Sequence, residues 1–217
     1  MTRGQHDQYV AGEFNRAAAR YDDSRFVQSY QRRVQALVVD SLDLKQGMSV
    51  LDLGCGTGWA TLEIASRLAG TGNVVGLDLS EGMIEQARSK LPRFRYDNVQ
   101  FVLQSASSLN YAGRFDCVIS TNAYHHFADK VGVFEKVWKS LRAGGSFAIQ
   151  DYCRDFLLMR VVDEMGKIGE KAHVGTTRSS DLRELFLSQG FVAVRIETIK
   201  LNWLWGIMIG RGTKPVT

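Results

Sequence analysis

The sequence contains no apolar run long enough to cross a lipid bilayer, which takes about 20 consecutive apolar residues. Its most apolar late stretch, residues 201–209, is much shorter and predicts a buried strand. The N-terminus, MTRGQHDQYV, is polar and does not have the apolar core of a secretory signal peptide. We therefore expect a soluble cytoplasmic chain without a membrane span.

Cysteine is also scarce. Cys55, Cys117 and Cys153 are the three in the chain, and none belongs to a C-x-x-C pair. An odd number of widely spaced cysteines is not the pattern of a disulfide framework and indicates a reducing compartment. We predict no metal site.

A concentrated basic surface is missing too. The net charge is +4 and the isoelectric point is near 9.0, but lysines and arginines are scattered among acidic residues. The one adjacent basic pair, Arg32 and Arg33, falls within a predicted helix, where a solvated helix face is the simpler interpretation. The charge pattern therefore argues against a nucleic-acid partner.

The length of 217 residues and the composition, 45% hydrophobic and 23% charged, suit one globular domain. The first forty residues have helical patterns, and we expect residues 1–44 to form a helical cap on a domain of residues 45–217. Ser24 is the expected N-cap of the second helix. The apolar face of this helix is expected to consist of Phe26, Tyr30, Val34 and Leu37.

Strands then alternate with helices. Apolar strands are expected at residues 50–53, 73–78, 99–103, 115–120 and 146–150, the last after a glycine break at 143–145. Ser80 and Asp129 are candidate caps for two of the intervening helices. A mostly helical insertion is expected at about 155–189, before two closing strands at 191–201 and 202–213. The alternation predicts an α/β fold with helices on both faces of a mostly parallel sheet, and the closing strands predict an antiparallel hairpin.

The stretch VLDLGCGTGWAT, residues 50–61, places three glycines directly after the first strand. A dinucleotide fingerprint needs a third glycine where this chain has Trp59, which argues against NAD and FAD. The loop has no lysine and no G-K-[ST], which excludes a P-loop. What remains is a loop whose backbone approaches a ligand closely at a helix N-terminus.

Two acidic residues lie at the ends of successive strands. Asp52 precedes the glycine loop and suits a positively charged ligand group, while Asp78 ends the second strand, where a carboxylate can accept hydrogen bonds from ribose hydroxyls. Together they favour an adenosine-type ligand.

These residues carry a family resemblance. Residues 50–58, Asp78, residues 122–127 and residues 141–145 resemble the class I S-adenosylmethionine-dependent methyltransferases, in particular the small type 11 enzymes related to quinone-biosynthesis C-methyltransferases. The resemblance covers about residues 45–150, and residues 14–22 also resemble the N-terminal helix of that group. It implies a Rossmann-like sheet of seven strands that ends in the antiparallel hairpin.

The resemblance also implies S-adenosylmethionine as the cofactor. The glycines would bracket its methionine moiety, Asp52 would organise its ammonium group and Asp78 would hold the ribose. The full set of cofactor-binding residues implied in this way is Tyr21, Asp52, Gly54, Cys55, Gly56, Gly58, Asp78, Leu79, Met83, Ser105, Ala106, Ser107, Thr121 and Asn122.

One position departs from the family pattern. After the third strand, related enzymes usually have an acid that binds the adenine amino group, but this chain has Ser105. A serine hydroxyl accepts hydrogen bonds without the strength of a charge-assisted bond, so the departure predicts weaker cofactor binding rather than its loss.

The resemblance implies methyl transfer by in-line displacement, in which the protein aligns a nucleophile and excludes water. His125, His126 and Tyr152 are the candidate catalytic residues, because they follow strands at the edge where ligands bind in such sheets. For His125, two roles stay open, that of a general base and that of a packed structural histidine. For His126, the structural role is the favoured interpretation. His173, within the helical insertion, is a weaker candidate for an acceptor pocket.

The leading hypothesis is a methyltransferase that acts on a small-molecule acceptor. An RNA or protein methyltransferase is the first alternative, although residues 121–124, TNAY, stand where many base methyltransferases have N-P-P-Y. A non-catalytic, cofactor-binding partner subunit is the second, favoured only by Ser105.

Overall fold

The computed structural model describes residues 2–23, 25–94, 96–161, 163, 175–201 and 206–216. The chain begins with two helices, α1 (Arg3–Tyr21) and α2 (Arg25–Ser41). Thr2 starts α1 through a capping box, in which its hydroxyl accepts from the Gln5 amide and the Gln5 side chain accepts from the Thr2 amide. The predicted cap of α2, Ser24, lies outside the described residues.

The buried face of α2 differs from the predicted one. Val34 is buried as expected, but Leu37 is 36% exposed, and Val38 and Val39 are fully buried instead. The prediction extended the apolar face from Val34 to Leu37, three positions later. In the structure the helix is rotated so that Val38 and Val39, four and five positions after Val34, face the core instead.

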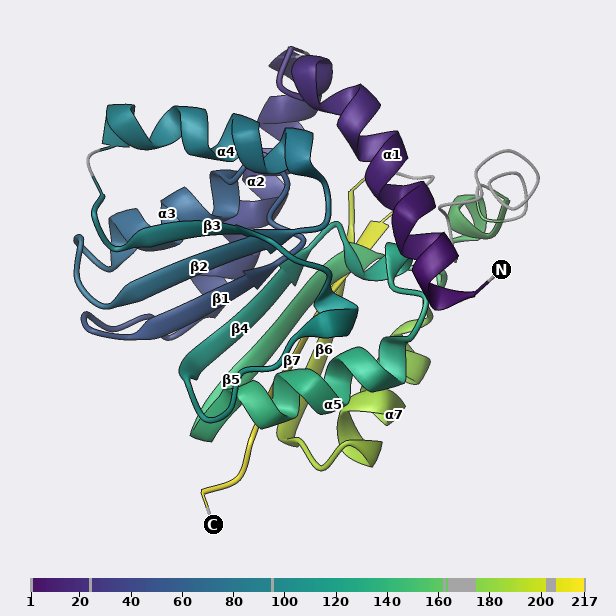
Figure 1. Ribbon diagram of the computed structural model, residues 1–217. Helices are drawn as coiled ribbons and strands as arrows, with labels where there is room; N and C mark the ends of the chain where they lie inside the picture. The colour runs from purple at the N-terminus through teal and green to yellow at the C-terminus, as the bar shows by residue number, and fades with distance from the viewer. Residues whose placement is uncertain are drawn as a thin grey trace.

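Strands and helices then alternate over the rest of the chain (Figure 1). The strands are β1 (Ser49–Leu53), β2 (Asn73–Asp78), β3 (Val99–Leu103), β4 (Phe115–Thr121), β5 (Leu141–Tyr152), β6 (Val192–Lys200) and β7 (Gly206–Thr213). The helices between them are α3 (Trp59–Arg67), α4 (Glu81–Phe94), α5 (Lys130–Ser140) and α7 (Ser179–Ser188), with short 3-10 turns η1 (Ala106–Ser108) and η2 (Tyr124–His126). Residues 157–161 are also helical.

The predicted fold class is confirmed. The seven strands form one sheet in the order β3-β2-β1-β4-β5-β7-β6, and β7 runs antiparallel to both of its neighbours. Strand β1 pairs with β2 on one side and with β4 on the other, so the direction of winding reverses between β1 and β4. In open α/β sheets a crevice forms at this switch point, outside the carboxyl ends of the strands.

Both predicted helix caps that lie in the described part are present. The hydroxyl of Ser80 accepts a hydrogen bond from the Met83 amide at 3.2 Å, and the carboxylate of Asp129 accepts one from the Gly132 amide at 2.9 Å. Each side chain satisfies an amide that the first turn of a helix leaves without a partner.

The beginning of β5 corrects a prediction. Residues 143–145 do not separate α5 from the strand, because β5 begins at Leu141, directly after the helix. The pairing register with β4 shifts between Phe115 and Cys117, and Gly144 has a φ of +76°. The glycines therefore allow the start of the strand to bend into an irregular pairing rather than end it.

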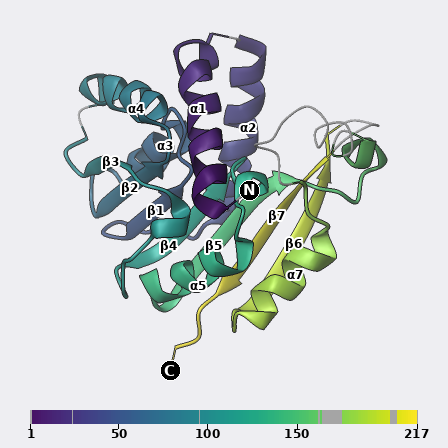
Figure 2. The same ribbon diagram turned by 45° about the vertical axis from the view of Figure 1, so that its right-hand side comes forward.

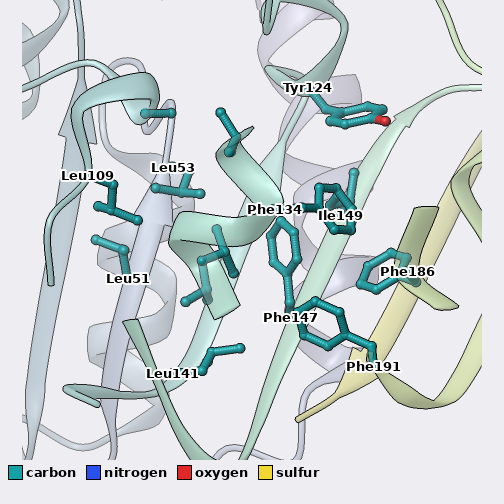
Figure 3. Close-up of a cluster of buried hydrophobic side chains, with 14 of the residues drawn as sticks. Leu51, Leu53, Leu109, Tyr124, Phe134, Leu141, Phe147, Ile149, Phe186 and Phe191 are labelled. Atoms are coloured by element: carbon teal, nitrogen blue, oxygen red, sulfur yellow. The ribbon is translucent and has the colours of Figure 1, made fainter. Parts of the chain in front are cut away.

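Two hydrophobic layers cover the sheet. On one face, α5 packs on β5 and α7 packs on β6 and β7, and Phe134, Phe147, Phe186 and Phe191 form an aromatic cluster there (Figure 3). The ring centroids of Phe134 and Phe147 are 5.0 Å apart, and those of Phe134 and Phe186 are 4.9 Å apart, in edge-on contacts. The helices α2, α3 and α4 lie on the other face (Figure 2). Their buried side chains, such as Val38, Ile64 and Ile84, form a second hydrophobic cluster with the strands.

Some predictions fall on residues that the structure does not describe. These are the insertion residues 164–174, with His173, and residues 202–205, which interrupt the predicted last strand. Among the described helices, none has the length and apolar character needed to cross a membrane.

Candidate active site

A cavity of about 700 Å³ lies at the carboxyl ends of β1, β2 and β4, beneath helix α1. Figures 1 and 2 show α1 crossing this end of the sheet. The lining combines the glycine loop, the ends of three strands and the first two helices, and it consists of Val10, Phe14, Tyr21, Gln35, Gly54, Cys55, Gly56, Thr57, Trp59, Asp78, Leu79, Met83, Thr121, Asn122, Ala123, His126 and Phe127. Mostly apolar and aromatic side chains with a few polar groups form this lining, as is usual for a small-molecule site.

The glycine loop has backbone angles that L-residues rarely adopt. Gly54, Gly56 and Gly58 have φ values of +71°, +53° and +85°. A Cβ on Gly54 would lie 2.5 Å from the Cβ of Ala123, and one on Gly58 would lie 2.7 Å from the ring of Phe101. A Cβ on Gly56 would meet no atom within 4 Å. The outer glycines thus allow close packing, whereas Gly56 faces open space, where a ligand can approach the backbone.

Asp78 holds this loop in place and also lines the cavity. One carboxylate oxygen accepts the Gly56 amide at 2.9 Å, and the other accepts the Ser80 amide at 2.9 Å. Burial raises the pKa of Asp78 above its usual value, although these amide donors oppose the shift. Each oxygen has further lone pairs, so the carboxylate can accept additional hydrogen bonds from a ligand.

Asp52 lies beneath the loop instead of in the cavity lining. It is fully buried, and its Oδ2 accepts the Thr61 hydroxyl at 2.6 Å. Burial raises its pKa to about 7, with the charge of Asp78 adding to the shift and the Thr61 hydroxyl opposing it. The structure therefore places Asp52 under the base of the loop, where it contacts the start of α3.

The remaining predicted cofactor residues divide between two cavities. Tyr21, Cys55, Leu79, Met83, Thr121 and Asn122 line the main one. Ser105, Ala106 and Ser107 line a smaller cavity of about 310 Å³, which shares Leu79, His126 and Phe127 with the main cavity. Gly58 is the N-cap of α3 and packs on Phe101. Burial raises the pKa of the Cys55 thiol, which makes a thiolate there unfavourable.

Asn122 has an unusual backbone conformation for a residue with a side chain, with a φ of +51°. Its Oδ1 accepts a hydrogen bond from Nε2 of Gln150 at 3.1 Å, and its backbone N–H donates to the backbone carbonyl of Gln150 at 3.0 Å. The end of β5 thus fixes the Asn122 side chain at the wall of the cavity.

The two adjacent histidines have different surroundings. His125 is 8% exposed, and its Nδ1 lies 2.8 Å from Oδ1 of Asp151, whose Oδ2 accepts the His125 amide at 2.7 Å. Burial alone would raise the pKa of Asp151, but the charge and hydrogen bonds of His125 lower it below the usual value. His126 lines the cavity and is half-buried, and its ring centroid lies 3.9 Å from that of His125.

The structure places His126 in the lining of the cavity, where it also packs on Phe14, and His125 in a buried pair with Asp151. Tyr152 has its ring centroid 5.7 Å from that of His125 and donates its amide to Asp151. The sequence reasoning did not include Asp151, although its position at the carboxyl end of β5 is the same signal that singled out Tyr152.

Helix α1, with Asp22 directly after it, forms the roof of the cavity. His6 Nε2 lies 2.9 Å from the His126 carbonyl, and Asn15 accepts the Ser80 hydroxyl at 2.7 Å. Asp22 accepts hydrogen bonds from the Thr57 hydroxyl at 3.0 Å and from Trp59 Nε1 at 3.3 Å, and it pairs with Lys90 at 2.7 Å. The roof is therefore tied to each loop around the cavity.

The sequence reasoning missed most of this roof. Val10, Phe14 and Gln35 line the cavity from α1 and α2. The ring of Phe14 meets that of His126 edge-on at 5.1 Å. Only Tyr21 was expected here, because a helix gives no local sign of the distant loops that it will cover.

Comparison with known proteins agrees with this geometry. A family model described as a methyltransferase domain matches residues 44–189. The demethylmenaquinone methyltransferase of Lactococcus lactis is 26% identical over 215 residues, covering 88% of this chain and 85% of that protein. Phosphoethanolamine N-methyltransferase 3 of Arabidopsis thaliana is 37% identical over 117 residues, which are 54% of this chain but only 23% of that protein.

Among solved structures, the magnesium protoporphyrin IX methyltransferase of Synechocystis with bound S-adenosylhomocysteine superposes with a TM-score of 0.73. The match is 22% identical in sequence and covers 96% of this chain and 99% of that one. At this identity the likeness concerns the fold.

Proposed function

The chain belongs to the class I S-adenosylmethionine-dependent methyltransferases, and we propose that it transfers the methyl group to a small-molecule acceptor held under helix α1. Bound S-adenosylmethionine supplies a methyl group that its sulfonium already activates. The observation that carries the acceptor proposal is the lining of the cavity under the roof, in which apolar and aromatic side chains predominate.

The residues around the cavity fit the cofactor. Gly56 leaves room for a ligand against the backbone, and the Asp78 carboxylate is placed to accept hydrogen bonds from ribose hydroxyls. Leu79 and Met83 offer apolar contacts for a base, and the ring of Tyr21 suits a neighbouring cation. Asp52 would act through the loop that it supports, because it is buried beneath that loop.

The chain's own task in such a reaction is to align the acceptor and to exclude water. The roof suits both tasks. Val10 and Phe14 close the cavity from α1, and Phe127 contributes an aromatic ring from the loop after β4. A largely apolar, small acceptor fits this lining better than an RNA or a protein chain, which would need an open surface.

The relatives give the proposal further support. By their names, one methylates demethylmenaquinone and another phosphoethanolamine, both small molecules. The apolar lining under α1 suits a quinol-like acceptor better than a charged headgroup.

We assign the contact with the acceptor to His126, which faces the cavity. Its ring would orient the acceptor and would take a proton from it where the nucleophile must lose one. His125 and Asp151 would act as positioning residues, since the buried pair holds one imidazole 3.9 Å from the other. Tyr152 would support the same pair through its amide.

Calorimetry with S-adenosylmethionine and S-adenosylhomocysteine tests the cofactor, and we expect saturable binding of both. A transfer assay with radiolabelled cofactor over quinols, phenols, thiols, acyl carriers and tRNA then tests the acceptor. We expect the wild-type protein to transfer the label to a small molecule. His126→Ala should abolish this transfer, and His125→Ala should retain part of it. Label only on tRNA or protein would overturn the proposal, and binding without any transfer would favour a non-catalytic partner subunit.

A further inference from the structure

Helix α1 brings a carboxylate to the turn after β3. Oδ2 of Asp7 accepts hydrogen bonds from the Ser105 hydroxyl at 2.7 Å and from the Ser107 hydroxyl at 2.8 Å. Oδ1 of Asp7 takes part in neither bond. A negative charge thus stands beside Ser105, the position at which the turn itself has no acid, and it comes from a residue 98 positions earlier in the chain.

The place of this carboxylate follows from the sheet. Asp78 pairs with Leu103 across β2 and β3, and the Gln104 amide donates to the Asp78 carbonyl at 2.9 Å, so Ser105 begins the adjacent turn. Asp7, Ser105, Ala106 and Ser107 line the smaller cavity, which continues from the main one past Leu79. A nucleoside with its ribose at Asp78 and its base against Leu79 would reach this turn, because Leu79 lines both cavities.

The chemistry of the turn suits an amino group. The exocyclic amine of adenine is a hydrogen-bond donor, and a site that selects it needs a fixed acceptor. The two serine hydroxyls fix the orientation of the Asp7 carboxylate, and an ionised acceptor forms a stronger hydrogen bond than a neutral hydroxyl.

We propose that Asp7 accepts a hydrogen bond from the adenine amino group, so that α1 supplies the residue that recognises the base. This inference rests on the proposed function, because it takes the cavity to be the cofactor site. It also links two events: docking of α1 completes the base site, and a bound base holds α1 in place. By thermodynamic reciprocity, each must strengthen the other.

Calorimetry with two nucleosides tests the assignment. S-adenosylhomocysteine has the amino group, and S-inosylhomocysteine has a carbonyl oxygen in its place. We expect the wild-type protein to prefer the adenosyl compound by roughly 10- to 100-fold, the range of a hydrogen bond to a charged group. In Asp7→Asn the amide can donate to that carbonyl, so the preference should fall to about threefold or less.

Asn15→Ala is the matched control. Asn15 also anchors α1, through the Ser80 hydroxyl and the Gly82 amide, but it lies away from the turn after β3. Loss of the Asn15 side chain should weaken the binding of both compounds equally and leave the ratio of their affinities unchanged. An unchanged ratio in Asp7→Asn would show that Asp7 only anchors the helix, and would overturn the inference while leaving the cofactor assignment intact.

A second variant covers the case in which Asp7→Asn does not fold. Asp7→Ala combined with Ser105→Asp restores a carboxylate at the same turn, and we expect it to recover at least a tenfold preference for the adenosyl compound. A ratio near one in this variant would contradict the inference. If the wild-type protein binds neither compound, the proposed function fails and the inference fails with it.

Discussion

The floor and the roof of the cavity are built in different ways. The floor consists of residues 54–58, 78–80 and 121–127, which follow the carboxyl ends of β1, β2 and β4. Its loops are fixed by backbone hydrogen bonds, such as those from the Gly54 and Cys55 amides to the Leu77 carbonyl at 2.8 and 3.0 Å, and by the buried carboxylates of Asp78 and Asp151. The roof, α1 with Asp22, is attached through side chains, among them those of Arg3, His6, Asp7, Asn15 and Asp22.

This difference predicts which part of the cavity opens when ligands enter or leave. Backbone bonds within the sheet break only when the sheet itself opens, whereas contacts of single side chains break one at a time. The floor should therefore keep its geometry in the free protein, and the roof should be the part that yields when ligands enter or leave. Four predictions test this division, beginning with the largest expected effect.

Gly54→Ala should destabilise the floor most. The new Cβ would lie 2.5 Å from that of Ala123, and the backbone φ of +71° is unfavourable for alanine. Strain and overlap together should lower the free energy of unfolding by about 3 kcal/mol. Urea denaturation measures the change.

Gly56→Ala is the matched control, since its Cβ would meet nothing within 4 Å. It should lower the free energy of unfolding by only about 1 kcal/mol, the cost of its φ of +53°, while reducing cofactor affinity. Equal destabilisation by the two substitutions would contradict the packing described for Gly54.

Asp78→Ala should reduce the affinity for S-adenosylhomocysteine by roughly 100-fold, because it removes a charged acceptor and releases the Gly56 amide. His125→Ala should reduce it by about threefold or less, because His125 belongs to the buried pair with Asp151. Calorimetry on both variants gives the comparison, and the reverse order would mean that the ribose position is assigned wrongly.

Asp52 should make the stability of the floor depend on pH. Its pKa of about 7 in the folded protein lies above the value of an exposed aspartate, so the folded state holds the proton more tightly. The stabilisation from this proton is full in acid and is lost as the pH rises through about 7. Between pH 5 and pH 8, the difference in unfolding free energy between wild type and Asp52→Asn should fall by about 2 kcal/mol. A difference that stays constant with pH would contradict the raised pKa.

Asp22→Asn should loosen the roof with the smallest effect on stability. The substitution weakens the pairing with Lys90 and the hydrogen bonds from Thr57 and Trp59, which should lower the free energy of unfolding by about 1 kcal/mol. Dissociation of S-adenosylhomocysteine should become about tenfold faster, which stopped-flow measurements can follow. An unchanged dissociation rate would mean that Asp22 does not hold the roof closed.

The same division describes what the sequence could predict. The strand bounds of β2 and β3 and the caps Ser80 and Asp129 depend on neighbouring residues, and local patterns indicated them correctly. The seven-stranded sheet with its antiparallel closing strands followed from the family resemblance and is confirmed. The cofactor and catalytic roles of individual residues stay predictions.

What the sequence did not indicate depends on distant contacts. Asp7 meets Ser105 across 98 residues and Asp22 meets Thr57 across 35, and no local pattern marks either pair. The buried face of α2 was misjudged and the surroundings of the two histidines were left open, because helix rotation and side-chain direction depend on what packs against them. The roof is therefore the part that needed the structure.

Hydrogen–deuterium exchange with and without S-adenosylhomocysteine tests most directly whether floor and roof form one cofactor site. We predict slower amide exchange on binding both in residues 54–58 and in α1, with the larger change in α1, because the roof opens more easily in the free protein. Protection confined to the floor, or no protection in either region, would contradict this account.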